Sequence, residues 1–306
     1  MTTFWANTHF ANSSTRFPWR LEYFPTRGFV ALATRDFAAG DEICTESPLF
    51  WIRSHSPTRE EILVELESLS SEERAAFYDL SNTSSCAERE VGIFTSNAFD
   101  MTHSKYGEEV SGLYCAIARL NHSCTPNVQQ THYPDSDKEY LHATRDILAG
   151  EELNDCYIHL LQPRHSRREE LLRLYGFECE CSACSLPSLE EIREDDRKRV
   201  RARELEDLVV ELASECKLAD AIDVNESLLR LLLSKAAYGW SERFQAAAYM
   251  SSYMLHSSCG ANKKAKEHLR RAVELNSRYE GINSQQTQKY RTLLDSLVVY
   301  DVECKS

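Results

Sequence analysis

The chain has 306 residues, of which 42% are hydrophobic and 27% charged, with a formal net charge of -13. These values are typical of a folded globular protein and exclude disordered and fibrous chains, and no stretch approaches the roughly 18 apolar residues of a membrane helix. Residues 1–185 carry 16 Lys+Arg against 28 Asp+Glu. This acidity disfavours binding to duplex nucleic acid and suits a basic peptide, although it is also consistent with solubility alone.

The eleven cysteines do not indicate a secreted disulfide scaffold, because their number is odd and the chain is long. Residues 1–20 contain no basic segment followed by an apolar run, so they predict neither a signal peptide nor a transit peptide. We therefore expect reduced thiols, some of them bound to metal, in an intracellular protein of the nucleus, the cytoplasm or both.

The first part of the chain has the pattern of short strands. Residues 1–20 give no periodic signal and are expected to form an irregular lead-in. From Leu21 the pattern becomes strand-like: residues 28–33 are mostly apolar, and residues 39–42 form a turn before the apolar Ile43. A hairpin of short strands is predicted here.

Two short helices are predicted between residues 56 and 82. Thr58 with Glu61, and Ser70 with Glu73, have the spacing of helix capping boxes. The apolar stripe at helical spacing consists of Ile62, Leu63, Leu66 and Leu69.

The pattern returns to short segments over residues 110–160, with a strand at 139–144 before an Ala149-Gly150 turn. A helix is predicted over 167–174, and the chain is nearly all helical in pattern beyond Pro187. The spacing of Ala265, His268, Leu269 and Ala272 is similar to that of tetratricopeptide helices. Because no clean period of about 34 residues is present, antiparallel helix hairpins are the safer prediction.

Three closely spaced thiols predict a metal site. Cys179-x-Cys181-x-x-Cys184 lets one tight loop surround a tetrahedral Zn²⁺. A structural site needs a fourth ligand, for which Cys115, Cys124, Cys156 and nearby histidines are candidates, whereas three ligands and a water would suit a catalytic ion. The simpler alternative is three unrelated buried cysteines.

Five ordered motifs resemble those of SET-domain methyltransferases. The most diagnostic is the run Arg119-Leu120-Asn121-His122-Ser123-Cys124-Thr125-Pro126-Asn127. The others are the loop around Arg27-Gly28-Phe29, the segment Gly150-Glu151-Glu152-Leu153-Asn154-Asp155-Cys156-Tyr157, the triplet Tyr175-Gly176-Phe177, and the cysteines 179 to 184. Together they span about residues 22–185, and five matches in order make coincidence improbable.

The arrangement is most similar to the SET- and MYND-domain family of fungal type, although the MYND zinc finger is missing. The only cysteine and histidine in residues 46–95 are Cys86 and His55, whereas that finger needs about eight such ligands. The resemblance implies an α+β fold. Its parts are an irregular lead-in (1–20), a β-rich SET domain with a pseudoknot (21–160) and a helical insert (about 46–95), a zinc-bound post-SET loop (161–186), and an all-α tetratricopeptide-like domain (187–306).

The resemblance also implies a function, namely transfer of methyl groups from S-adenosylmethionine to protein lysines, with a basic, lysine-containing segment as substrate. It makes Tyr157 the catalytic residue. The implied cofactor-binding residues are Arg27, Gly28, Phe29, Asn121, His122, Tyr157 and Phe177. The implied substrate-channel residues are Tyr114, Tyr175 and Phe177, and the implied ligands of one structural zinc are Cys124, Cys179, Cys181 and Cys184.

Val30 departs from the family pattern, because the cofactor loop usually reads Gly-x-Gly and a β-branched residue does not easily adopt positive φ. The loop then either uses an ordinary backbone conformation or holds the cofactor more loosely. A catalytically silent SET scaffold that binds a partner through its C-terminal helices is therefore the first alternative. A zinc-stabilised nucleic-acid adaptor is the second, and the acidity of residues 1–185 disfavours it.

Three further patterns have simpler interpretations. Glu151 and Glu152 are expected to close a turn rather than to form an acid–base pair. Ser123-Cys124 beside His122 lacks the surroundings of a nucleophilic hydrolase. The basic residues at 197–203 are flanked by acidic ones, so a solvated charged helix is preferred to a nucleic-acid patch.

Overall fold

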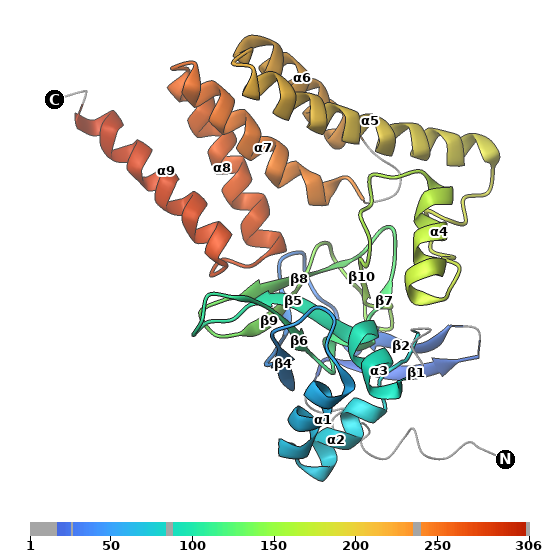
Figure 1. The fold of residues 1–306 in the computed structure, drawn as a ribbon. Helices are drawn as coiled ribbons and strands as arrows, with labels where there is room; N and C mark the ends of the chain where they lie inside the picture. The colour runs from blue at the N-terminus through green and yellow to red at the C-terminus, as the bar shows by residue number, and fades with distance from the viewer. Residues whose placement is uncertain (1–16, 26, 84–87, 235–239, 304–306) are drawn as a thin grey trace. The chain divides into compact units, whose positions relative to one another are not determined.

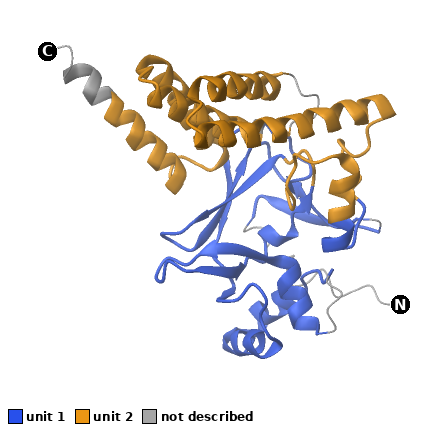
Figure 2. Ribbon diagram, turned by 45° about the horizontal axis from the view of Figure 1, so that its top comes forward, with its two compact units in different colours: residues 1–122, 127–155, 171–178 blue, residues 123–126, 156–170, 179–306 orange. Residues whose placement is uncertain are grey.

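The computed structural model describes residues 17–25, 27–83, 88–234 and 240–303. The chain divides into two compact units (Figure 2). Unit 1 comprises Met1–His122, Asn127–Asp155 and Leu171–Glu178, and unit 2 comprises Ser123–Pro126, Cys156–Glu170 and Cys179–Ser306. Among the described helices, none has the length and apolar character needed to cross a membrane.

Unit 1 is built from small β-sheets (Figure 1). Its sheets have the strand orders β1-β2, β3-β9-β8 and β4-β6-β5, all antiparallel, and β7 pairs with β10 in parallel. The strands are β1 (Trp19–Phe24), β2 (Gly28–Ala33), β3 (Glu42–Glu46), β4 (Phe50–Ile52), β5 (Ala98–Thr102), β6 (Glu109–Leu113), β7 (Asn121–His122), β8 (Val128–Tyr133), β9 (Lys138–Ala143) and β10 (Asn154–Asp155).

The strands predicted at 28–33 and 139–144 are confirmed as β2 and β9. The predicted lead-in over 1–20 lies outside the described residues as far as residue 16, and β1 begins at Trp19, which is 4% exposed. Val30 lies in β2 opposite Glu22 and is 2% exposed. Its backbone is ordinary, since the non-glycine residues with positive φ in the described part are Asp137 and Cys216. The branched side chain is therefore buried from a strand position, where its backbone conformation is unstrained.

The two predicted helices of the insert are confirmed as α1 (Arg59–Ser68) and α2 (Ser71–Tyr78). Both begin with a complete capping box, in which the hydroxyl of Thr58 or Ser70 and the carboxylate three residues later exchange bonds with the backbone. A third helix, α3 (Arg89–Asn97), was not predicted. Together with apolar residues of β4 and β6, the helices enclose a core cluster that includes Ile62, Leu66, Phe77, Ile93 and Phe94.

Unit 2 is mostly helical, and each helix from α5 onward packs against the next (Figure 1). The helices are α4 (Arg164–Tyr175, whose last residues belong to unit 1), α5 (Leu189–Ser214), α6 (Leu218–Leu233), α7 (Glu242–Ser258), α8 (Asn262–Tyr279) and α9 (Gln285–Glu303). Apolar side chains of these helices are buried, among them Leu205 and Val209 of α5 and the predicted Ala265, Leu269 and Ala272 of α8. The β-sheets are thus followed by a helical C-terminal region.

The basic segment 197–203 lies on α5. Its exposed members pair along the helix: Arg197 with Glu194, Arg201 with Glu204, and Arg203 with Asp207. These ion pairs agree with a solvated charged helix. Arg199 differs, because its side chain is fully buried and pairs with Asp195. The prediction of a solvated charged helix is therefore wrong for Arg199.

Two stacked histidines in unit 2 predict a loss of stability at acid pH. His256 of α7 and His268 of α8 have ring centroids 5.2 Å apart and planes 4° from parallel. Burial, with smaller effects of His256 and Lys264, lowers the pKa of His268 despite Glu267 and Glu226 nearby. Because the folded pKa lies below the unfolded value of about 6.5, the unfolded chain binds more protons, and stability falls as pH decreases through about 6.5.

We expect His268→Gln to flatten this dependence between about pH 7.5 and 5, as measured by the midpoint of urea unfolding. His165→Gln, a change at an exposed residue of α4, is the matched control and should keep the wild-type slope. Identical slopes for all three proteins would contradict the prediction.

Candidate functional site

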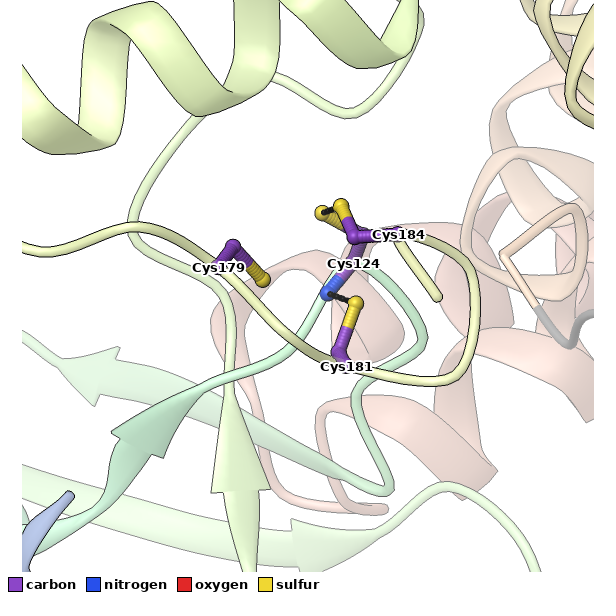
Figure 3. Close-up of side chains that lie close together, drawn as sticks. All are labelled: Cys124, Cys179, Cys181 and Cys184. Atoms are coloured by element: carbon purple, nitrogen blue, oxygen red, sulfur yellow. Dashed lines mark hydrogen bonds between the residues drawn. The ribbon is translucent and has the colours of Figure 1, made fainter. Parts of the chain in front are cut away.

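Four cysteines of unit 2 bring their side chains together (Figure 3). The Sγ atoms of Cys124, Cys179, Cys181 and Cys184 all lie within 4.8 Å of one another, and those of Cys124 and Cys184 are 3.6 Å apart. Four sulfurs at about 2.3 Å from a tetrahedral metal would be about 3.8 Å apart. The donor set and its spacing therefore fit one thiophilic metal ion.

The local backbone explains how the loop reaches this arrangement. The N–H groups of Cys184 and Ser185 both donate to the carbonyl of Cys181, at 2.9 Å. This turn separates the last two cysteines, whose sulfurs lie within 4.8 Å of each other. The N–H of Cys124 donates to the sulfur of Cys181 at 3.4 Å, so the segment after His122 is joined to the loop more than fifty residues later. Such N–H···S bonds favour a thiolate.

Of the three cysteines considered as the fourth ligand, Cys124 is the one that joins the cluster. Cys115 lies in the core of unit 1, where burial, aided by Glu46, raises its pKa to about 12. The described sulfurs that gather at the loop are those of Cys124, Cys179, Cys181 and Cys184. The thiol of Cys156 instead donates to the carbonyl of Ile158 at 2.8 Å.

A second group of predicted residues meets in unit 1 around Asn121. The Asn121 amide donates to the carbonyl oxygen of Phe29 at 2.9 Å and to Glu152 Oε1 at 3.1 Å. Arg27 Nη2 donates to both carboxylate oxygens of Glu152, at 2.8 and 2.7 Å. Both N–H groups of the amide are engaged, so its oxygen is the polar atom left to accept a hydrogen bond from a ligand.

The backbone that carries Asn121 is held by parallel pairing. In β7 and β10, Asn121 lies opposite Asn154, and His122 lies opposite Asp155. Gly28, at the start of β2, has a φ of +72°, which explains why glycine is needed there, immediately after Arg27. The predicted residues Arg27, Gly28, Phe29 and Asn121 therefore form one polar site in unit 1.

The aromatic residues of the predicted site have different surroundings. His122 and Phe177 have ring centroids 6.4 Å apart, and both belong to unit 1. Tyr175 ends α4 and is half-buried, as is Tyr157, which follows β10 by two residues and belongs to unit 2. Tyr114 is fully buried, and its hydroxyl donates to the carbonyl of Asp137 at 3.1 Å. A role for these residues in a substrate channel stays a prediction.

The Gly150-Glu151-Glu152 turn is partly structural, as predicted. Gly150 has a φ of +86°, and Glu151 accepts hydrogen bonds from Arg145 and from the backbone N–H of Leu148. Glu152 differs, because its carboxylate contacts two of the predicted cofactor-binding residues. The sequence carries no signal for this contact, because it depends on the pairing of β10 with β7 two residues later, where Asn154 lies opposite Asn121.

Two buried arginines beside the cysteines were also not predicted. Arg167 donates to Cys124 Sγ at 3.3 Å, and Arg199 lies 3.4 Å from the carbonyl oxygen of Cys124. Both side chains are fully buried. The four-residue spacing of Asp195 and Arg199 could have suggested an ion pair, but it would have suggested one on the surface.

Comparison with known proteins agrees with this geometry. Residues 28–158 match the model of the SET domain, so this part of the chain is similar to SET domains. Over 163 residues it is 35% identical to the histone-lysine N-methyltransferase set5 of Schizosaccharomyces pombe, a match to 53% of this chain and 49% of the relative. It is 40% identical over 88 residues to the human histone-lysine N-methyltransferase SMYD3 (29% of this chain, 20% of the relative). It is 39% identical over 109 residues to the N-lysine methyltransferase SMYD2-B of Danio rerio (33% and 25%).

The predicted similarity to SET- and MYND-type proteins is thereby confirmed. The chain spans about half the length of the first of these relatives and a quarter or less of the other two.

Proposed function

We propose that this SET-domain protein transfers methyl groups from S-adenosylmethionine to lysine side chains of proteins. The observation that carries the proposal is the Asn121 amide, fixed by Phe29 and Glu152 within the segment that matches the SET domain. The relatives that align with this segment are named as methyltransferases of histone lysines or of protein lysines.

The polar site around Asn121 suits the amino-acid end of the cofactor. The oxygen of Asn121 can accept a hydrogen bond from an ammonium group, and Arg27, paired with Glu152, offers further N–H donors for a carboxylate. We assign His122, Gly28 and Phe177 to the remaining cofactor contacts. When bound, S-adenosylmethionine supplies a methyl group made electrophilic by a sulfonium.

The reaction needs alignment and dehydration more than acid–base catalysis. The substrate ammonium first loses a proton to water, a loss that a channel of low polarity favours because it lowers the ammonium pKa. The neutral nitrogen then forms the new N–C bond while the S–C bond breaks and its electron pair stays on sulfur. Tyr157 would orient the methyl group through the dipole of its phenol, and Tyr114, Tyr175 and Phe177 would line the channel.

Replacing Tyr157 tests its catalytic role. Tyr157→Phe removes an oriented dipole beside the reacting atoms, and we expect about a 100-fold loss in the rate of methyl transfer with nearly unchanged cofactor affinity. The measurements are transfer of radiolabelled methyl groups to histones and lysate proteins, and calorimetric titration with S-adenosylmethionine. Tyr106→Phe, at an exposed residue, is the control. Unchanged turnover in Tyr157→Phe would remove the residue from this role.

Glu152 gives a second prediction. Glu152→Gln weakens the ion pair with Arg27 and loosens the Asn121 amide, so we expect the Kd for S-adenosylmethionine to rise about tenfold, equivalent to about 1.4 kcal/mol. Glu108→Gln, which breaks an exposed ion pair with Arg53, is the matched control. Equal cofactor affinity in wild type and Glu152→Gln would show that the carboxylate acts only in the turn.

We further propose that the four cysteines hold one structural Zn²⁺, since four thiolates at tetrahedral spacing favour zinc over harder ions. Cys124→Ser is expected to abolish stoichiometric zinc, as measured by mass spectrometry of the metal content. It should also weaken cofactor binding, because Phe177 lies two residues before the first ligand of the loop. Cys216→Ser and Cys259→Ser, at exposed thiols, should retain zinc. Zinc-free protein with full activity would refute the structural role.

The silent-scaffold alternative relied on Val30, whose ordinary strand backbone now removes that reason. Failure of zinc-loaded protein to bind S-adenosylmethionine would restore it. We also propose the finer features implied by the resemblance: the pseudoknot, the zinc-bound loop over 161–186, the tetratricopeptide-like domain over 187–306, and the boundaries of the SET domain. A basic, lysine-containing substrate segment and a nuclear or cytoplasmic location remain part of the proposal.

A further inference from the structure

Arg167 is a charged side chain placed where charge is costly. It comes from α4, is fully buried, and its Nε donates to Cys124 Sγ at 3.3 Å. Its Nη1 donates to the carbonyl of Gln162, and its Nη2 lies 3.7 Å from Asp195 Oδ2. One end of the guanidinium therefore faces a thiol, and the other faces a buried carboxylate.

Asp195 is itself held by two further side chains of unit 2. Arg199 Nε donates to its Oδ2 at 2.7 Å, and the indole N–H of Trp240 donates to its Oδ1 at 2.9 Å. The Arg199 guanidinium lies 4.9 Å from the centre of the Trp240 ring and also donates to the carbonyls of Leu160 and Cys124. All three side chains are at most 2% exposed. Asp195 is therefore locked in one position.

A separate contact also joins α4 and α5. The backbone N–H of Arg164 donates to Asp196 Oδ1, and its Nε donates to the carbonyl of Cys184, both at 2.6 Å. Residues 195 and 196 of α5 thus engage arginines 167 and 164 of α4, and each of these arginines reaches one of the cysteines. The contacts connect the start of the long helix α5 to two members of the cluster, Cys124 and Cys184.

Charge balance explains why buried arginines lie beside the four cysteines. Four thiolates around one Zn²⁺ carry a net charge of about -2. Burying this charge without compensation is expensive, as is burying guanidinium groups without anions. Two buried arginines and one buried aspartate supply a net charge of +1 beside the cluster. The metal site and the arginine network therefore each provide the counter-charge that the other needs.

We propose that Arg167 is a positioning residue of the metal site, and that Asp195, Arg199 and Trp240 hold it so that metal binding and the packing of the start of α5 are coupled. The inference rests on the zinc proposal but not on methyl transfer. Arg167 lowers the free energy of the tetrathiolate through a charge-assisted N–H···S bond. In return, the tetrathiolate stabilises the buried cations and, through Asp195, the first turns of α5.

The test measures zinc affinity of the full chain by competition with a chromophoric chelator. Arg167→Met, which keeps an unbranched apolar side chain and removes the guanidinium with its charge, is expected to weaken zinc binding by about 10- to 100-fold. Asp195→Asn should weaken it less. Arg167→Lys should recover part of the loss through charge alone. Arg201→Met, at an exposed arginine of α5 paired with Glu204, is the matched control and should bind zinc like wild type.

A thermodynamic cycle separates this role from simple packing. In the Cys124→Ser background, Arg167→Met should change the urea unfolding midpoint little or raise it, because the arginine has lost the sulfur that it contacts and keeps only the carboxylates of Asp195 and Asp196 nearby. In the zinc-loaded wild-type background it should lower the midpoint. Equal losses in both backgrounds would mean that Arg167 only fills space, and would overturn the proposal, as would wild-type zinc affinity in Arg167→Met.

The coupling to α5 has its own measurement, which also separates this inference from the proposed function. Chelation of zinc should speed amide hydrogen exchange in the first turns of α5 in wild type, while the C-terminal half of α8 should change little. Unaltered exchange in α5 after zinc removal would refute the coupling. Zinc-dependent exchange in a protein that transfers no methyl groups would support the coupling and refute the proposed activity.

Discussion

In the proposed zinc site, the need to neutralise buried charge explains the contacts that surround the four cysteines of unit 2. Three of the thiols come from one loop and the fourth from a segment more than fifty residues earlier. Closing so long a loop costs conformational entropy, and a metal ion with four strong bonds can supply the compensating free energy. The same four bonds leave negative charge on the sulfurs. Arg167 meets this charge directly, and its own charge requires Asp195.

In unit 1, polar side chains are satisfied by one another. Arg27, Asn121 and Glu152 are polar side chains at the edge of a β-rich core, and they satisfy one another. Since the carboxylate accepts from both partners, the orientation of the Asn121 amide is set before any ligand arrives. A site organised in advance loses less entropy on binding. Glu152 therefore belongs to the proposed cofactor site, whereas its neighbour Glu151 accepts hydrogen bonds from Arg145, Asn127 and the Leu148 N–H.

The features predicted best from the sequence depend on residues close together in the chain. The capping boxes at Thr58 and Ser70 are complete because the partner carboxylates lie three residues away, and their chemistry needs nothing else. The strand at 28–33 and the turn at Gly150 follow from equally local patterns. Cys124 is a non-local partner of the loop, and neither spacing nor composition distinguished it from Cys115 and Cys156. Its assignment came from the motif in which it lies.

The features that were missed depend on residues far apart in the chain. Asp195 and Arg199 have the spacing of a surface ion pair, and their neighbours Arg197, Arg201 and Arg203 do form such pairs. Arg199 becomes buried because Trp240 covers it, and that tryptophan follows 41 residues later, after two long helices. Whether a charged residue lies inside or outside depends on the partners that the fold brings to it. For Arg167 that partner is the sulfur of Cys124, which carries a charge only where a metal or a hydrogen-bond donor stabilises the thiolate. Sequence patterns treat arginine and cysteine separately. A buried contact that depends on both residues therefore becomes visible only in the structure.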